Sequence, residues 1–102
     1  MSNAPSLSPI DRLLAIMRQL RNPDGGCEWD LAQDFTTISP YTIEEAYEVA
    51  DAIASGSPEA ICDELGDLLL QVVFHAQIAT DKGLFGFDDV ADDAVQVCPR
   101  RV

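Results

Sequence analysis

Basic residues are scarce in this sequence. Its 102 residues include six lysines and arginines against 18 aspartates and glutamates, and the formal net charge at pH 7 is −12. Nucleic-acid-binding domains usually carry a basic patch, so the composition argues against a nucleic acid as partner. An anionic ligand would need cations to approach this chain, and bound divalent ions are often the largest local charges in a site. The charge balance therefore favours metal ions as the bridge to an anionic substrate.

Long apolar runs, paired cysteines and alternating patterns are also missing. No apolar run approaches the roughly 20 residues of a membrane span and no secretory pattern opens the chain, so we expect no membrane partner. Cys27, Cys62 and Cys98 are odd in number and lack a Cys-x-x-Cys spacing, which suggests neither a disulfide framework nor a zinc site. A reducing cytoplasm fits this cysteine usage. No run alternates apolar and polar residues over the length of a strand, so the prediction is all-α.

Helical signals account for most of the chain, and its length suits a single domain. Residues 1–8 are interpreted as an expression remnant and an N-terminal extension. Ser8 and Pro9 fit the N-cap and first position of a helix that ends near residue 20, and residues 27–35 are expected to be loop with at most one short turn. Three further helices are predicted: from Thr37 or Ser39 to about Ser55 with Pro40 in the first turn, from Pro58 to about Thr80 after a Ser57 cap, and from Asp89 to about Val97 after an Asp88 cap.

The helix predicted over 58–80 is apolar in nearly every direction. A helix with this pattern is buried in a large core or between subunits. A chain of 102 residues with three or four helices can hardly surround it. We therefore expect a helical bundle that is completed by dimerisation, as a homodimer or a tetramer built from dimers.

Carboxylates gather on the two central helices. On a helical wheel, the predicted core stripe of the earlier helix is Ala46, Val49, Ala50 and Ile53. Tyr41, Glu45 and Glu48 share the adjoining flank, with Glu44 just beyond it. Carboxylates this close repel one another, which a divalent cation would relieve.

A narrow polar stripe also runs along the otherwise apolar later helix. Glu64 and Asp67 are neighbours on one face, and Gln71 and His75 continue it. Buried carboxylates are costly unless they are paired or bound to metal. Facing helices could bring four to five oxygen donors together, a set that suits Mg²⁺ or Mn²⁺.

Each feature alone has a plainer interpretation. A Glu-Glu-x-x-Glu pattern on a helix is usually a solvated face. His75 is more often a hydrogen-bonded structural histidine, and Trp29 is more often a packing residue. The two carboxylate segments together, on adjacent helices, favour a metal site.

The combined pattern resembles the MazG nucleotide pyrophosphohydrolases, an all-α family of nucleoside triphosphate pyrophosphatases. The resemblance covers about residues 9–95. Four segments carry it: Asp11-Arg-Leu-Leu-Ala-Ile-Met17, Gly26-Cys-Glu-Trp-Asp30, Thr37-Ile-Ser-Pro-Tyr-Thr-Ile-Glu-Glu-Ala-Tyr-Glu48 and Asp63-Glu-Leu-Gly-Asp-Leu-Leu-Leu-Gln-Val-Val-Phe-His75.

This resemblance implies hydrolysis of NTPs or dNTPs to the monophosphate and pyrophosphate, as in cleaning of the nucleotide pool. It implies Mg²⁺, with Mn²⁺ as a substitute, at Glu45, Glu48, Glu64 and Asp67. Glu44 and Glu45 would be catalytic, with Glu44 positioning a water or a second ion. Tyr41 and Trp29 are the expected substrate contacts, and Arg21, near the Trp29 loop, is expected to meet the phosphates.

The end of the sequence departs from the family pattern. Residues 9–97 are predicted to form the MazG-like domain, and residues 98–102 an atypical tail in place of a basic segment. We expect weaker triphosphate binding as a result. The alternative to an enzyme is a MazG-like dimerisation or nucleotide-binding module with little or no turnover.

Overall fold

The computed structural model describes residues 7–101, and within that range it contains five helices and no strand. The all-α prediction is confirmed. The chain divides into two compact units, residues 1–32 and residues 33–102. In the described part of the chain, no helix combines the length and the apolar character needed to cross a membrane.

The first unit contains α1 (Pro9–Leu20) and the short α2 (Glu28–Leu31). Ser8 caps α1 as predicted, since its hydroxyl accepts from the Asp11 N–H at 3.2 Å. The turn after α1 requires Gly26, because a Cβ atom there would lie 2.4 Å from the Asn22 carbonyl oxygen. The predicted loop with one short turn is confirmed by α2.

The second unit begins with α3 (Phe35–Ser55). Its N-cap is Asp34, whose carboxylate accepts from the Thr37 N–H at 2.9 Å while the Thr37 hydroxyl accepts from the Asp34 N–H at 2.8 Å. The predicted start at Thr37 or Ser39 is therefore wrong, because this reciprocal pair begins the helix earlier. Pro40 consequently lies inside α3 rather than in its first turn.

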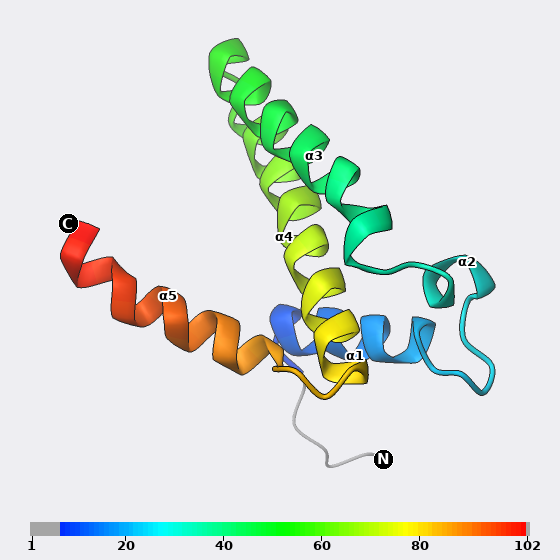
Figure 1. The fold of residues 1–102 in the computed structure, drawn as a ribbon. Helices are drawn as coiled ribbons and strands as arrows, with labels where there is room; N and C mark the ends of the chain where they lie inside the picture. Colours follow the sequence, from blue (N-terminus) through cyan, green and yellow to red (C-terminus); the bar gives the residue numbers. More distant parts are fainter. Residues whose placement is uncertain (1–6, 102) are drawn as a thin grey trace, which may run out of the picture. The chain divides into compact units, whose positions relative to one another are not determined.

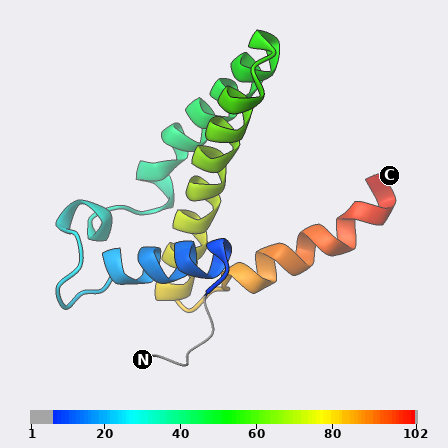
Figure 2. The ribbon, with the colours of Figure 1, turned by 180° about the vertical axis from the view of Figure 1, so that it is seen from behind.

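α4 (Pro58–Asp81) follows after a tight turn at Gly56, whose φ of 75° is in the left-handed region that glycine tolerates. Ser57 caps α4 by accepting from the Ala60 N–H at 3.3 Å. The two helices run side by side and antiparallel along most of α3 (Figures 1 and 2). The apolar side chains buried in this unit are Ile38, Ala52, Val73, Phe74, Ala76, Ile78 and Ala79.

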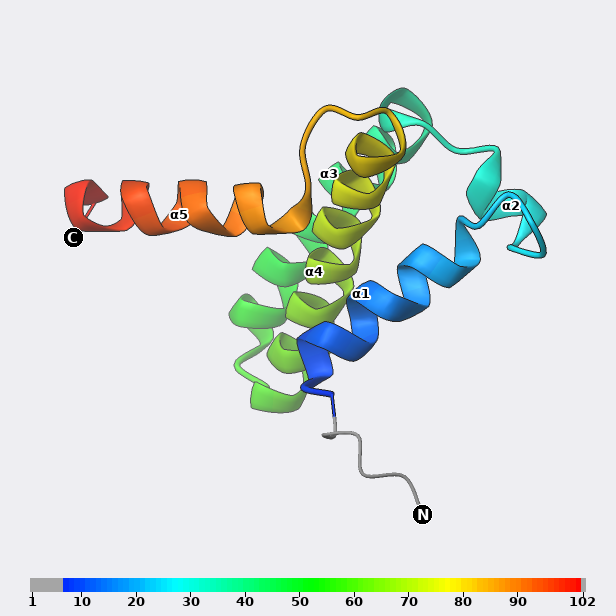
Figure 3. The ribbon, with the colours of Figure 1, turned by 90° about the horizontal axis from the view of Figure 1, so that it is seen from below.

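The last helix, α5 (Phe87–Arg101), packs against α4 and leads away from it (Figure 3). Asp88 was predicted as its cap but lies in its first turn. The Asp89 carboxylate instead accepts from the Gly86 N–H at 2.9 Å, so the helix starts earlier. The predicted end near Val97 is also wrong, because α5 continues through Pro99 and into the segment that the sequence marked as an atypical tail.

Candidate metal centre

The contact between α3 and α4 contains a seam of polar groups. On α3 the side facing α4 follows helical steps of three and four residues, through Ile38, Thr42, Glu45, Val49 and Ala52. Glu45 thus lies within the packed side of α3. The predicted core stripe is wrong in the single chain, because Ala46, Ala50 and Ile53 are exposed and only Val49 is half-buried.

Three of the four predicted metal ligands meet across this seam. Glu45 of α3 and Glu64 and Asp67 of α4 each offer a carboxylate oxygen, and these oxygens lie within 4.8 Å of one another. Glu45 and Glu64 are half-buried, whereas Asp67 is exposed. Three acidic oxygens this close, with two of them partly removed from water, suit a cation.

Glu48 is not part of this triad, but its charge acts on it. Burial and the neighbouring Asp67 carboxylate raise the pKa of Glu45, and the charges of Glu64, Glu44 and Glu48 add to the effect. Burial, Asp67 and Glu48 raise the pKa of Glu64, while a hydrogen bond with the Glu45 carboxyl group opposes the rise. The carboxylates therefore repel one another in the absence of a counter-ion.

The donor atoms fit a divalent cation. All are hard oxygens, the kind of ligand that Mg²⁺ and Mn²⁺ prefer. The Oε2 atom of Glu45 is fully buried and has no hydrogen-bond partner among the described residues. A buried carboxylate oxygen without a donor is costly, and a bound cation would remove that cost.

One turn before Glu45 on α3, Thr42 contacts His75 of α4. The Thr42 Oγ1 atom lies 2.8 Å from the His75 Nε2 atom, and the Phe35 ring stacks on the imidazole with centroids 5.8 Å apart. Burial lowers the pKa of His75. The structural interpretation of His75 is supported by these contacts. Thr42 was not anticipated, although its spacing from Ile38 and Glu45 placed it on the same side of the helix.

The other predicted site residues lie outside the triad. Glu44 and Tyr41 are exposed on α3, with Tyr41 one turn before Glu45. Trp29 lies on α2 in the first unit and is 53% exposed. Arg21 is buried in that unit, where its guanidinium donates to the Asp30 carbonyl and so connects the end of α1 to α2.

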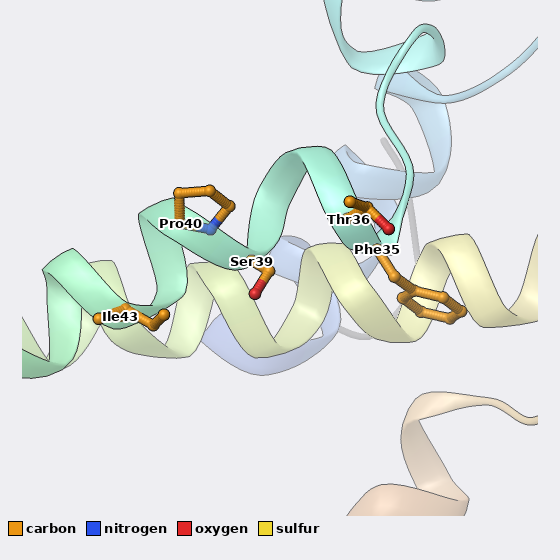
Figure 4. Close-up of a pocket in the computed structure, with 5 residues that line it drawn as sticks. All are labelled: Phe35, Thr36, Ser39, Pro40 and Ile43. Carbon is orange, nitrogen blue, oxygen red and sulfur yellow. The ribbon is translucent and has the colours of Figure 1, made fainter.

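A shallow groove of about 430 Å³ runs along the N-terminal half of α3 (Figure 4). None of the predicted site residues lines it. Its lining residues are Phe35, Thr36, Ser39, Pro40 and Ile43.

The site thus consists of facing carboxylates on two antiparallel helices of an all-α unit. Similarity to known proteins identifies the family. The MazG nucleotide pyrophosphohydrolase domain matches residues 33–102, so the chain belongs to the MazG family. A nucleoside triphosphate pyrophosphohydrolase of Escherichia coli K12 is 56% identical over 84 residues, covering 82% of this chain and 32% of that protein. The nucleoside triphosphate pyrophosphohydrolase/pyrophosphatase MazG of Thermotoga maritima is 50% identical over 81 residues, covering 79% and 31%. This chain thus spans about a third of the length of these relatives.

The raised pKa values predict a specific pH dependence of stability without metal. The pKa values of Glu45 and Glu64 are higher in the folded protein than in the unfolded chain, so protonation of these groups favours folding. This contribution to stability is complete below the unfolded pKa of 4.5 and is lost as the pH rises through the folded pKa values. Thermal melts in a chelator should therefore show wild type losing stability relative to Glu45→Gln over a pH range that begins at 4.5 and extends upward. A difference between the two proteins that stays constant across this range would contradict the raised pKa values.

Proposed function

We propose that this chain is a nucleoside triphosphate pyrophosphohydrolase domain, which cleaves NTPs or dNTPs to the monophosphate and pyrophosphate. The observation that carries the proposal is the convergence of Glu45, Glu64 and Asp67 oxygens within 4.8 Å across two helices. Membership of the MazG family and the names of the bacterial relatives support it. Clearing of unwanted nucleotides from the cellular pool is the role we assign to this reaction.

The proposed cofactor is Mg²⁺, with Mn²⁺ as a substitute, held by Glu45, Glu64 and Asp67 together with Glu48. Such an ion would polarise phosphoryl oxygens and lower the pKa of a water molecule. Glu48 supports this assignment through its charge on both Glu45 and Glu64.

The remaining roles fall to residues beside Glu45 on α3 and to two residues of the first unit. Glu44 is exposed beside Glu45 and its carboxylate would orient the attacking water. Tyr41, 47% exposed one turn before Glu45, would contact the nucleotide. In the first unit, Trp29 offers an exposed indole for stacking on a base, and Arg21, whose guanidinium also donates to the Asp30 carbonyl, would bind the phosphates.

A product assay tests this function directly. Each common NTP and dNTP would be incubated with the protein in Mg²⁺, in Mn²⁺ and in chelator, and the products would be separated by ion-exchange chromatography. We expect equal amounts of monophosphate and pyrophosphate, only when a divalent ion is present. Release of inorganic phosphate with a diphosphate would contradict the proposed cleavage position. Nucleotide binding without turnover would support the alternative, a nucleotide-binding module.

We also propose that the domain works as a homodimer or as a tetramer of dimers. Besides Tyr41, six large apolar side chains of α3 and α4 remain between 38% and 69% exposed in the single chain. Contiguous exposed apolar patches usually mark interaction surfaces, so we infer that these side chains contact another subunit. The residues are Ile43, Tyr47, Ile53, Leu65, Leu69 and Leu70.

A further inference from the structure

A glutamine in the α3–α4 seam has an unexplained buried oxygen. The Oε1 atom of Gln71 is fully buried, and no donor among the described residues reaches it. Buried amide oxygens are almost always hydrogen-bonded, so an orphaned one in a closely packed seam calls for an explanation. The other buried side-chain oxygen without a partner in the described chain is Oε2 of Glu45, a member of the carboxylate triad.

The contacts on either side of Gln71 fix its place. Asp67 lies four residues before it and His75 four residues after it, so all three share one side of α4. Asp67 meets Glu45 of α3, and His75 meets Thr42 of α3. Gln71 is therefore bracketed between these two cross-helix contacts and lies on the side of α4 that faces the Thr42–Glu45 turn.

The polar side chains next to Gln71 along the seam have other partners. Thr42 and His75 bond to each other. Glu45 brings only another acceptor when it is ionised, so the two buried oxygens cannot pair. What both oxygens lack is the same, namely a positive charge or a donor. Amide carbonyl oxygens are regular ligands of hard divalent cations, alongside carboxylates.

We propose that Gln71 is a further oxygen donor to the divalent ion of the carboxylate site, in addition to Glu45, Glu48, Glu64 and Asp67. The proposal rests on the metal site proposed above. A neutral donor adds an oxygen without adding to the repulsion that already raises the pKa values of Glu45 and Glu64. It also explains why an amide rather than an apolar side chain lies between Asp67 and His75.

Metal affinity without nucleotide tests the proposal. Mn²⁺ would be titrated into the full chain and its dissociation constant measured by electron paramagnetic resonance. Gln71→Met keeps the length and shape of the side chain but removes the oxygen. We expect its dissociation constant for Mn²⁺ to rise about 10-fold or more, in the range seen when groups that support metal ligands are removed. The metal-free melting temperature should stay level or rise, because an unpartnered buried oxygen is gone.

Two further variants separate this role from a structural one. Gln71→Glu restores an oxygen ligand, so it should bind Mn²⁺ at least as tightly as wild type while losing metal-free stability through added repulsion. The matched control is Gln77→Met, since the Gln77 amide donates to Asp81 at 2.9 Å on the same helix and should not affect Mn²⁺ binding.

The outcomes distinguish the proposal from the function that it rests on. Unchanged Mn²⁺ affinity in Gln71→Met, with weakened binding in Glu45→Gln, would overturn the role of Gln71 and leave the metal site standing. No Mn²⁺ binding by wild type at millimolar concentration would overturn both. A Gln71→Met protein that fails to fold leaves Gln71→Glu to decide, because weaker Mn²⁺ binding by that variant contradicts a ligand role.

Discussion

Glu45→Gln and Asp67→Asn should each lower Mg²⁺-dependent hydrolysis of NTPs by at least about 100-fold. Even groups that merely support metal ligands change metal affinity or activity by about 10- to 100-fold when they are removed, so loss of a ligand should cost more. The fold should survive, because both substitutions keep the shape of the side chain. Initial rates of pyrophosphate release, at Mg²⁺ concentrations up to 20-fold above those that saturate wild type, provide the measurement.

Stability should change in the opposite direction from activity. Without metal, the Glu45 carboxyl is half-buried beside the Glu64 and Asp67 carboxylates, and their charges raise its pKa. Replacing it with a neutral amide removes that repulsion, so Glu45→Gln should melt at or above the wild-type temperature in chelator at neutral pH. A residue kept only for packing would lose stability and activity together.

Asp51→Asn is the matched control for these substitutions. Asp51 is an exposed acid on α3, six residues beyond Glu45, and it is not among the charges that act on the triad. Its replacement should leave both hydrolysis and metal binding unchanged.

Full Mg²⁺-dependent activity in the double variant Glu48→Gln with Asp67→Asn would rule out the proposed site.

The chain's helices could be predicted from sequence because capping and turn residues act locally. Ser8, Ser57 and Gly56 end or begin helices where expected, since each effect depends on a few neighbouring backbone groups. The start of α3 was placed too late. Asp34 and Thr37 form a reciprocal cap, but threonine at the third position is a less familiar partner than glutamate.

The orientation of α3 was harder to predict than its existence. Helical periodicity shows that Ala46, Ala50 and Ile53 share a side, but it cannot say which neighbour they meet. In the single chain, α3 turns Glu45 and Thr42 toward α4 and leaves Ile53 59% exposed. The side of α3 that meets α4 combines the apolar Ile38, Val49 and Ala52 with the polar Thr42 and Glu45, so an apolar stripe alone does not identify it.

The meeting of Glu45, Glu64 and Asp67 could be predicted because these residues follow the helical repeat within two adjacent helices. Glu64 and Asp67 share a side of α4 by spacing alone, and the tight turn at Gly56 brings Glu45 opposite them. The local role of Arg21 had no such signal, because its bond to a backbone carbonyl depends on the turn between α1 and α2. A backbone acceptor leaves no trace in the residue type that carries it.

Disruption of the exposed apolar surface of α3 and α4 should have the second large effect. Leu69 of α4 is 40% exposed in the single chain, and Ile53 of α3 is 59% exposed. Leu69→Asp and Ile53→Asp each place a charge on this apolar surface. If these residues lie between subunits, burying an unpaired carboxylate there costs several kcal/mol. Each 1.4 kcal/mol is a tenfold change in a dissociation constant, so we expect assembly to weaken by about 100-fold or more.

Multi-angle light scattering at micromolar concentration measures this change. Wild type should show a mass of at least twice the 11.1 kDa of the single chain, and both variants should move toward the monomer. Val95→Asp is the control, because Val95 is an apolar residue that is 67% exposed but lies on α5 instead. It should leave the mass unchanged.

The stability of the separated chains distinguishes a weak subunit contact from an obligate one. Full burial of a leucine or isoleucine side chain contributes about 1.5–3 kcal/mol, and each of the six partly exposed side chains proposed for the interface would contribute a share of that value. The sum of these shares approaches the whole stability of a small domain. The dissociated variants should therefore melt at a lower temperature than wild type, and their melting temperature should depend on protein concentration. Mg²⁺ should raise the melting temperature in part by stabilising the α3–α4 pair. A wild-type chain that is a stable, well-folded monomer at micromolar concentration would contradict the proposed assembly.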